Sequence, residues 1–78
     1  MSADRPDPNA LIRQAQTLAR QAQTLAERGA NPVAVQSARH FLQGAFDAYR
    51  GRDTDLLDKN VRALRLLVEE LHKRPPRA

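Results

Sequence analysis

The chain has 78 residues, which corresponds to one domain at most. It carries 13 Lys and Arg residues against 9 Asp and Glu, a formal net charge of +4. It contains no Cys, which excludes a disulfide framework, a thiolate metal site and a Cys nucleophile. No apolar run is long enough to span a membrane, and the first residues lack the layout of a signal peptide. We therefore expect a soluble, cytoplasmic domain that does not bind membranes.

Three helices are predicted in chain order, because Gly and Pro punctuate the chain at regular intervals. Asp7-Pro8 and Asn31-Pro32 are each typical of an N-cap followed by Pro in the first helical turn. Gly29 and Gly51 predict the ends of the first two helices as C′ glycines. The predicted helices cover about residues 8–28, 32–50 and 54–73, the last capped by Asp53 or Thr54.

The short connections between these helices predict an all-α fold, an antiparallel three-helix bundle with up-down-up topology. We expect residues 1–7 to be a disordered N-terminal segment and residues 8–73 to form the bundle. Pro75-Pro76 prevents the last helix from continuing, so residues 74–78 are expected to form a basic, Pro-containing tail.

The first predicted helix contains an exact seven-residue repeat. Residues 13–19 and 20–26 both read Arg-Gln-Ala-Gln-Thr-Leu-Ala. This spacing gives a seam of alternating Leu and Ala, with further small residues widening it. The seam predicts packing within the bundle, with a homodimer interface as the alternative. The seam positions are Leu11, Ala15, Leu18, Ala22 and Leu25.

The second predicted helix has one apolar side and one polar side. Gly44 lies on the polar side, where glycine costs a helix about 1 kcal/mol relative to Ala. A glycine there can allow a partner to approach. We interpret Gly44 as tolerated by the helix rather than as a point of contact.

Two residues break the pattern of the third predicted helix. Asn60 falls inside the apolar side, where a buried amide can fix register or oligomeric state; the alternative is an amide at the edge of the seam, bonded to a backbone carbonyl or water. Leu66 falls on the charged side, among Lys59, Arg62, Glu70 and Lys73. It is either an ordinary exposed leucine or an anchor for a partner, with Arg62 and Lys59 as its rim. The residues expected to be buried are Leu56, Leu57, Val61, Ala63, Leu64, Leu67, Val68 and Leu71.

No group of residues indicates catalysis or a cofactor. His40 and His72 lie on different predicted helices and are expected to be exposed, so no helix offers a two-His metal site. The carboxylates at the start of the third helix are explained by capping and by i,i+4 pairing. The sequence also lacks a phosphate-binding glycine loop. We therefore expect no enzyme, no metal, no cofactor and no small-molecule substrate.

The positive charge points to nucleic acid only weakly, because it is concentrated at one end of the chain. Residues 73–78 supply three of the four net charges through Lys73, Arg74 and Arg77, which leaves residues 1–72 with a net charge of only +1. Arg13 and Arg20 lie one heptad apart and form a weak basic stripe. The sequence therefore keeps a small nucleic-acid-binding regulator, dimeric through the first helix, as the alternative function.

The order of helix, turn, Pro-initiated helix and Gly-x-Asp step resembles the C-terminal helical lid of DnaK-type heat-shock chaperones. Gly51-Arg52-Asp53 forms that step, Asn9-Ala10-Leu11-Ile12 resembles the start of the preceding lid helix, and the similarity covers residues 9–72. Such lids tend to be acidic, whereas this chain is basic. The nucleotide-binding and peptide-binding domains of those chaperones are absent from this sequence. The matching apolar positions are Leu18, Leu25, Leu57, Val61, Leu64, Leu67 and Leu71.

The resemblance implies a helical interaction subdomain, excised or reused alone, and it does not extend to ATP-driven peptide clamping. Together with the three amphipathic helices, it favours a non-enzymatic module that works by protein–protein contact. The partner is expected to be another protein or a second copy of the chain, with Leu66, Arg62 and Lys59 as the contact residues.

Overall fold

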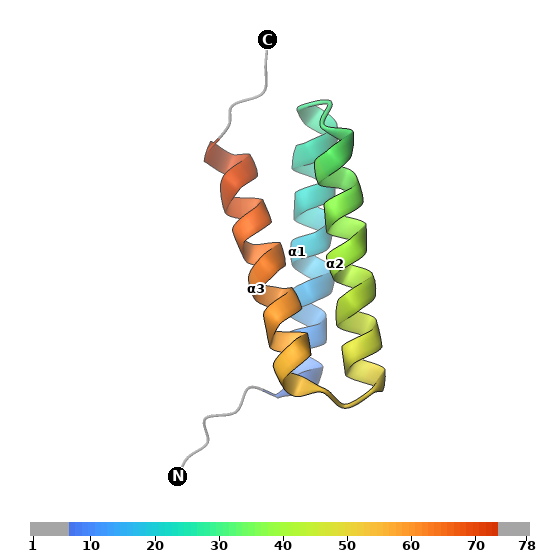
Figure 1. The fold of residues 1–78 in the computed structure, drawn as a ribbon. Helices are drawn as coiled ribbons and strands as arrows, with labels where there is room; N and C mark the ends of the chain where they lie inside the picture. Colours follow the sequence, from blue (N-terminus) through green and yellow to red (C-terminus); the bar gives the residue numbers. More distant parts are fainter. Residues whose placement is uncertain (1–6, 74–78) are drawn as a thin grey trace.

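The fold is known from a computed structural model, which describes residues 7–73. The helices are α1 (Pro8–Arg28), α2 (Pro32–Arg50) and α3 (Thr54–Lys73). They run up, down and up, so that α1 and α3 are parallel and α2 is antiparallel to both (Figure 1). Every pair of helices is in contact. The predicted all-α three-helix bundle and its helix boundaries are confirmed.

Each helix begins at a polar residue whose side chain accepts a hydrogen bond from a backbone N–H of the first turn. The carboxylate of Asp7 accepts from the N–H of Asn9 at 3.3 Å. Asn31 and Asp53 do the same for α2 and α3, each at 3.1 Å. Asp7 is therefore part of the folded bundle as the N-cap of α1. The rest of the segment expected to be disordered, residues 1–6, and the expected tail, 74–78, lie outside the described residues.

The end of α1 shows that the prediction of a C′ glycine was placed one residue too early. Gly29 is the C-cap and has φ −89°, whereas the left-handed residue is Ala30, with φ 53°. The N–H groups of Ala30 and Asn31 donate to the carbonyls of Glu27 and Ala26, which is a Schellman motif. The last residue of this motif, Asn31, is at once the N-cap of α2. One three-residue connection thus ends one helix and begins the next.

The connection between α2 and α3 repeats this geometry. Gly51 has φ −81°, and Arg52 takes the left-handed conformation with φ 58°. The N–H of Asp53 donates to the carbonyl of Ala48 at 2.9 Å, closing the same six-residue ring. Both turns therefore place a residue with a Cβ in the conformation that glycine adopts most easily.

The core is built mainly from alanine on α1 and α2 and from larger residues on α3. Small side chains let the helices approach closely, while Leu57, Val61 and Leu64 fill the space between them with at most 1% of their surface exposed. Of the predicted seam, Leu18 and Leu25 are only partly buried, because the neighbouring alanines occupy the centre of the interface. The other core residues are Leu11, Ile12, Ala15, Ala19, Ala22, Ala38, Ala45, Ala48 and Val68.

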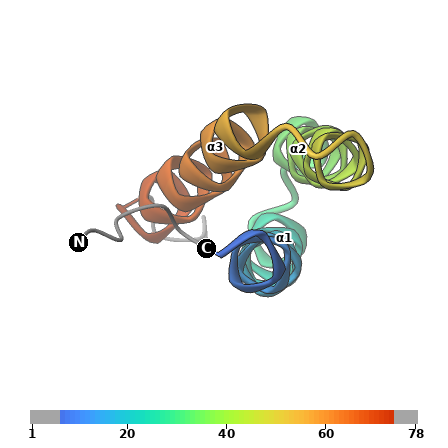
Figure 2. The same cartoon turned by 90° about the horizontal axis from the view of Figure 1, so that it is seen from below.

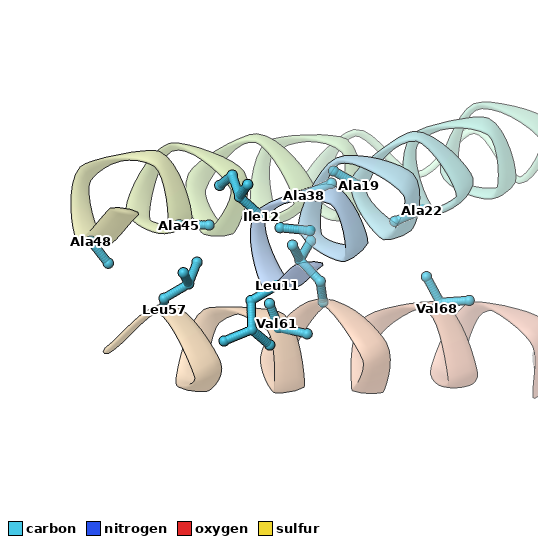
Figure 3. Close-up of a cluster of buried hydrophobic side chains, with 12 residues drawn as sticks. Leu11, Ile12, Ala19, Ala22, Ala38, Ala45, Ala48, Leu57, Val61 and Val68 are labelled. Atoms are coloured by element: carbon cyan, nitrogen blue, oxygen red, sulfur yellow. The ribbon is translucent and has the colours of Figure 1, made fainter. Parts of the chain in front are cut away.

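The axis of helix α3 is inclined to the axes of α1 and α2 (Figures 1 and 2). It starts beside the end of α2 and diverges from α2 toward its own C-terminal end (Figures 1 and 2). In Figure 3, Leu11, Leu57 and Val61 gather toward one end of the drawn cluster, and Val68 lies further along α3. Beyond Leu64, the apolar residues Leu67 and Leu71 are only partly buried, and the bundle is more open there.

The prediction that Leu56 is buried is wrong, since 44% of its surface is exposed. It lies in the first turn of α3, directly after the connection from α2, where the helix has just begun to pack. Leu57, the next residue, points into the core instead and is 1% exposed. The exposed end of the helix therefore carries an apolar side chain that the sequence pattern assigned to the interior.

Candidate functional site

Gly44 on α2 lies directly against the side chain of Asn60 on α3. A Cβ built on Gly44 would stand 2.7 Å from the Oδ1 atom of Asn60, so the space of the missing side chain is filled by that amide. The Nδ2 group of Asn60 donates to the carbonyl of Leu56 at 2.9 Å. The space beside Gly44 is therefore taken by a side chain from a helix of the same chain. Asn60 is half-buried at the edge of the interface.

Leu66 lies on the outer side of α3, facing away from the core. Its side chain is 61% exposed, and residues Lys59 and Arg62 are also exposed. Spacings of four and seven residues put the three on one face of the helix. Arg62 also pairs with Asp58, one turn earlier on α3, through an Nε–Oδ2 distance of 3.1 Å. The three predicted contact residues thus form one exposed surface on α3, which we call the Leu66 surface.

The residues predicted to contact nucleic acid come from two helices, as far as the structure describes them. Arg13 and Arg20 are exposed on α1, one heptad apart, and Lys73 is exposed at the end of α3. The remaining two, Arg74 and Arg77, lie outside the described residues. The described part of the chain therefore contributes two arginines from one helix and one lysine from another.

An open groove lies between α1 and α3 near the diverging end of the bundle, and sequence reasoning did not find it. Its volume is about 380 Å³. Five of its residues come from the seven-residue repeat of α1, and the sixth, His72, comes from α3. The lining residues are Thr17, Arg20, Gln21, Thr24, Leu25 and His72. The repeat in the sequence marks the helix that lines the groove. The position of the groove depends on which residues of α3 lie beside each copy of the repeat.

The two histidines lie on different helices and have different neighbours. His40 is exposed on α2, where its ring meets the edge of Phe41 with the centroids 5.6 Å apart. His72 is exposed in the groove on α3. In residues 7–73, no three His, Cys, Asp or Glu side chains come close enough to hold a metal ion. Within the same range, no helix combines the length and the apolar character needed to cross a membrane.

Comparisons with protein-family models, with curated proteins and with solved structures found nothing that matches the chain. What the fold itself defines is a class, that of small all-α three-helix bundles with an alanine-rich core. The surfaces that distinguish this member of the class are the Leu66 surface on α3 and the open groove between α1 and α3.

Proposed function

We propose that the chain is a non-enzymatic interaction module, as the resemblance to a chaperone lid implies, and that it binds another protein through the Leu66 surface. The observation that carries this proposal is the position of Leu66, a large apolar side chain 61% exposed at the centre of the outer face of α3. Burying a leucine side chain is worth about 1.5–3 kcal/mol, which makes it a suitable anchor.

The surroundings of Leu66 define the chemistry of the partner. Lys59 and Arg62 lie on one side of it, toward the start of α3. On the other side, Glu70 is exposed one turn after Leu66, and Arg62 is already paired with Asp58. The rim of this apolar anchor therefore carries both signs of charge, and the partner that fits is a protein with an apolar pocket or helix face flanked by charges of both signs. A second copy of this chain would offer such a surface through its own α3.

The test compares Leu66→Glu with a matched control, Val33→Glu. Val33 is 73% exposed in the first turn of α2, so the control makes the same kind of change at another exposed apolar residue. Glu is a good helix former, so both variants should keep the helix content seen by circular dichroism. Affinity capture from the source cells and light scattering of the purified chain then report partner binding and self-association.

The proposal predicts that Leu66→Glu loses its captured partner, or dissociates the dimer, while Val33→Glu behaves as the unchanged chain. We expect a loss of affinity of at least tenfold, which corresponds to about 1.4 kcal/mol. Equal capture by all three proteins would contradict the proposal, and so would a monomer that captures no protein. Binding lost in both variants would also contradict it, because the effect would then not belong to the Leu66 surface.

A further inference from the structure

The open groove arises where the repeat of α1 meets two different residues of α3. In the first copy of the repeat, Gln14 accepts a hydrogen bond from the Nη2 group of Arg65 at 3.4 Å. Because α1 and α3 run parallel, a step of seven residues along both helices leads from this pair to Gln21 and His72 (Figure 1). The long guanidinium side chain of the first pair is replaced there by a shorter imidazole. Gln21 and His72 both line the groove instead of closing it.

The groove combines hydrogen-bond donors and positive charge with one apolar residue. Arg20 supplies a guanidinium and Thr17 a hydroxyl group, while the hydroxyl of Thr24 already donates to the carbonyl of Arg20 at 3.0 Å. Leu25 is partly buried and provides the apolar part of the lining. None of the six lining residues is acidic, and α1 has no Asp or Glu before Glu27; on α3, Glu69 is exposed one turn before His72. The guanidinium of Arg20 beside Leu25 is therefore complementary to an anion that also carries an apolar group.

We infer that this groove is a second binding site, which takes a short acidic peptide segment. A carboxylate of the peptide pairs with Arg20, and an adjacent apolar side chain packs on Leu25. A volume of about 380 Å³ is at the lower end of the usual range for ligand sites and suits a few side chains rather than a whole helix. His72 is six residues from Leu66, which separates them by about 120° around α3. The site is therefore distinct from the Leu66 surface, and either proposal can fail without the other.

A peptide suits the groove better than a phosphate backbone. Proteins that hold single-stranded nucleic acid use rows of cations together with aromatic side chains on which bases stack. The groove offers one arginine and a leucine, and the remaining lining residues are Thr17, Gln21, Thr24 and His72. A carboxylate next to an apolar side chain matches this arrangement, since Arg binds carboxylates through paired hydrogen bonds.

The experiment is an NMR titration of the ¹⁵N-labelled chain with the peptide acetyl-Glu-Leu-Glu-amide. We expect a dissociation constant of about 1 mM or below, with shifts concentrated at the amides of Thr24, Leu25 and His72. Two further peptides, acetyl-Glu-Ser-Glu-amide and acetyl-Gln-Leu-Gln-amide, remove the apolar group and the charges in turn. Each should bind at least about fivefold more weakly than the first.

The repeat provides a matched control for the protein side. Arg20→Gln should weaken binding about tenfold, because a hydrogen bond to a charged group is lost. Arg13→Gln makes the same change at the same position of the first copy, outside the groove, and should alter binding less than twofold.

Three results would overturn the inference. The first is the absence of shifts up to several times the expected dissociation constant. The second is an equal loss of binding in Arg13→Gln and Arg20→Gln, which would show a diffuse effect of charge. The third is tighter binding of a ten-nucleotide oligo-dT, which would identify the face of α1 as a phosphate-binding surface instead.

Discussion

The two ends of this bundle are built differently, although both rest on the same three helices. Near the connection between α2 and α3, Leu57, Val61 and Leu64 are almost fully buried, and Asn60 fills the space beside Gly44. Near the connection between α1 and α2, the buried residues on α1 and α2 are alanines, and larger side chains such as Leu25 are only partly covered. We call these the closed half and the open half.

The difference shows how a repeat can serve two purposes in one helix. The two copies on α1 are identical, so what each copy does depends on the residue of α3 that it meets. In the first copy, Gln14 accepts a hydrogen bond from the exposed side chain of Arg65, which follows the buried Leu64. In the open half, Gln21 lines the groove together with His72. The closed half is therefore expected to carry most of the stability, and the open half to carry a binding site.

The largest expected effect is that of truncating a leucine in each half. Leu64 is fully buried, and Leu64→Ala should lower the free energy of unfolding by about 2–5 kcal/mol. This is comparable to the whole stability of so small a domain, so the variant should be largely unfolded. Leu71 is partly buried in the open half, and Leu71→Ala should cost less than about 2 kcal/mol. Urea denaturation followed by circular dichroism measures both, and equal losses would contradict the division into halves.

An intermediate effect is expected from the contact between Gly44 and Asn60. In Gly44→Ala the new Cβ displaces the amide of Asn60, so the hydrogen bond from Asn60 to the carbonyl of Leu56 is lost. This loss offsets the gain in helix propensity, which is about 1 kcal/mol. In the Asn60→Ala background the space is free, so the same substitution should stabilise the chain by that full amount. A double-mutant cycle by chemical denaturation should show a coupling of about 1 kcal/mol. Additive effects would mean that the two residues do not compete for one space.

The smallest effects are expected in the two connections, which share one geometry. Ala30→Gly and Arg52→Gly each relieve a left-handed residue that carries a Cβ and should stabilise the chain by about 0.5–1 kcal/mol. Gly29→Ala is the control, since its φ of −89° suits any residue and a Cβ there would lie 3.6 Å from the carbonyl oxygen of Leu25. Gly29→Ala should therefore not lower the free energy of unfolding, and thermal denaturation of all three variants measures these changes. A gain in one connection and not in the other would show that the two turns differ.

The sequence predicted the helices well because capping is local. Asp7 and Asn31 are N-caps followed by Pro, and the glycines mark the helix ends to within one residue. The contacts between helices were harder to predict, because they depend on register. Gly44 lies on the polar side of its own helix, and only the neighbouring helix gives it a role.

The groove was missed for the same reason as the Gly44 contact. Its polar lining looks like an ordinary solvated face in the sequence of α1 alone. It becomes a site only because α3 diverges and places His72 beside the second copy of the repeat. The exposure of Leu66, in contrast, follows from the periodicity of one helix and could be read from the sequence directly.

The most direct test of the two halves is amide hydrogen exchange measured residue by residue. α1 and α2 are joined at the open half, so fraying of the chain ends does not explain a difference between their two halves. We predict that Ala45 and Ala48, in the closed half of α2, exchange only through global unfolding. Ala38 and, on α1, Ala26 should exchange through local opening, with free energies at least about 1 kcal/mol lower. Equal protection of all four amides would contradict the account.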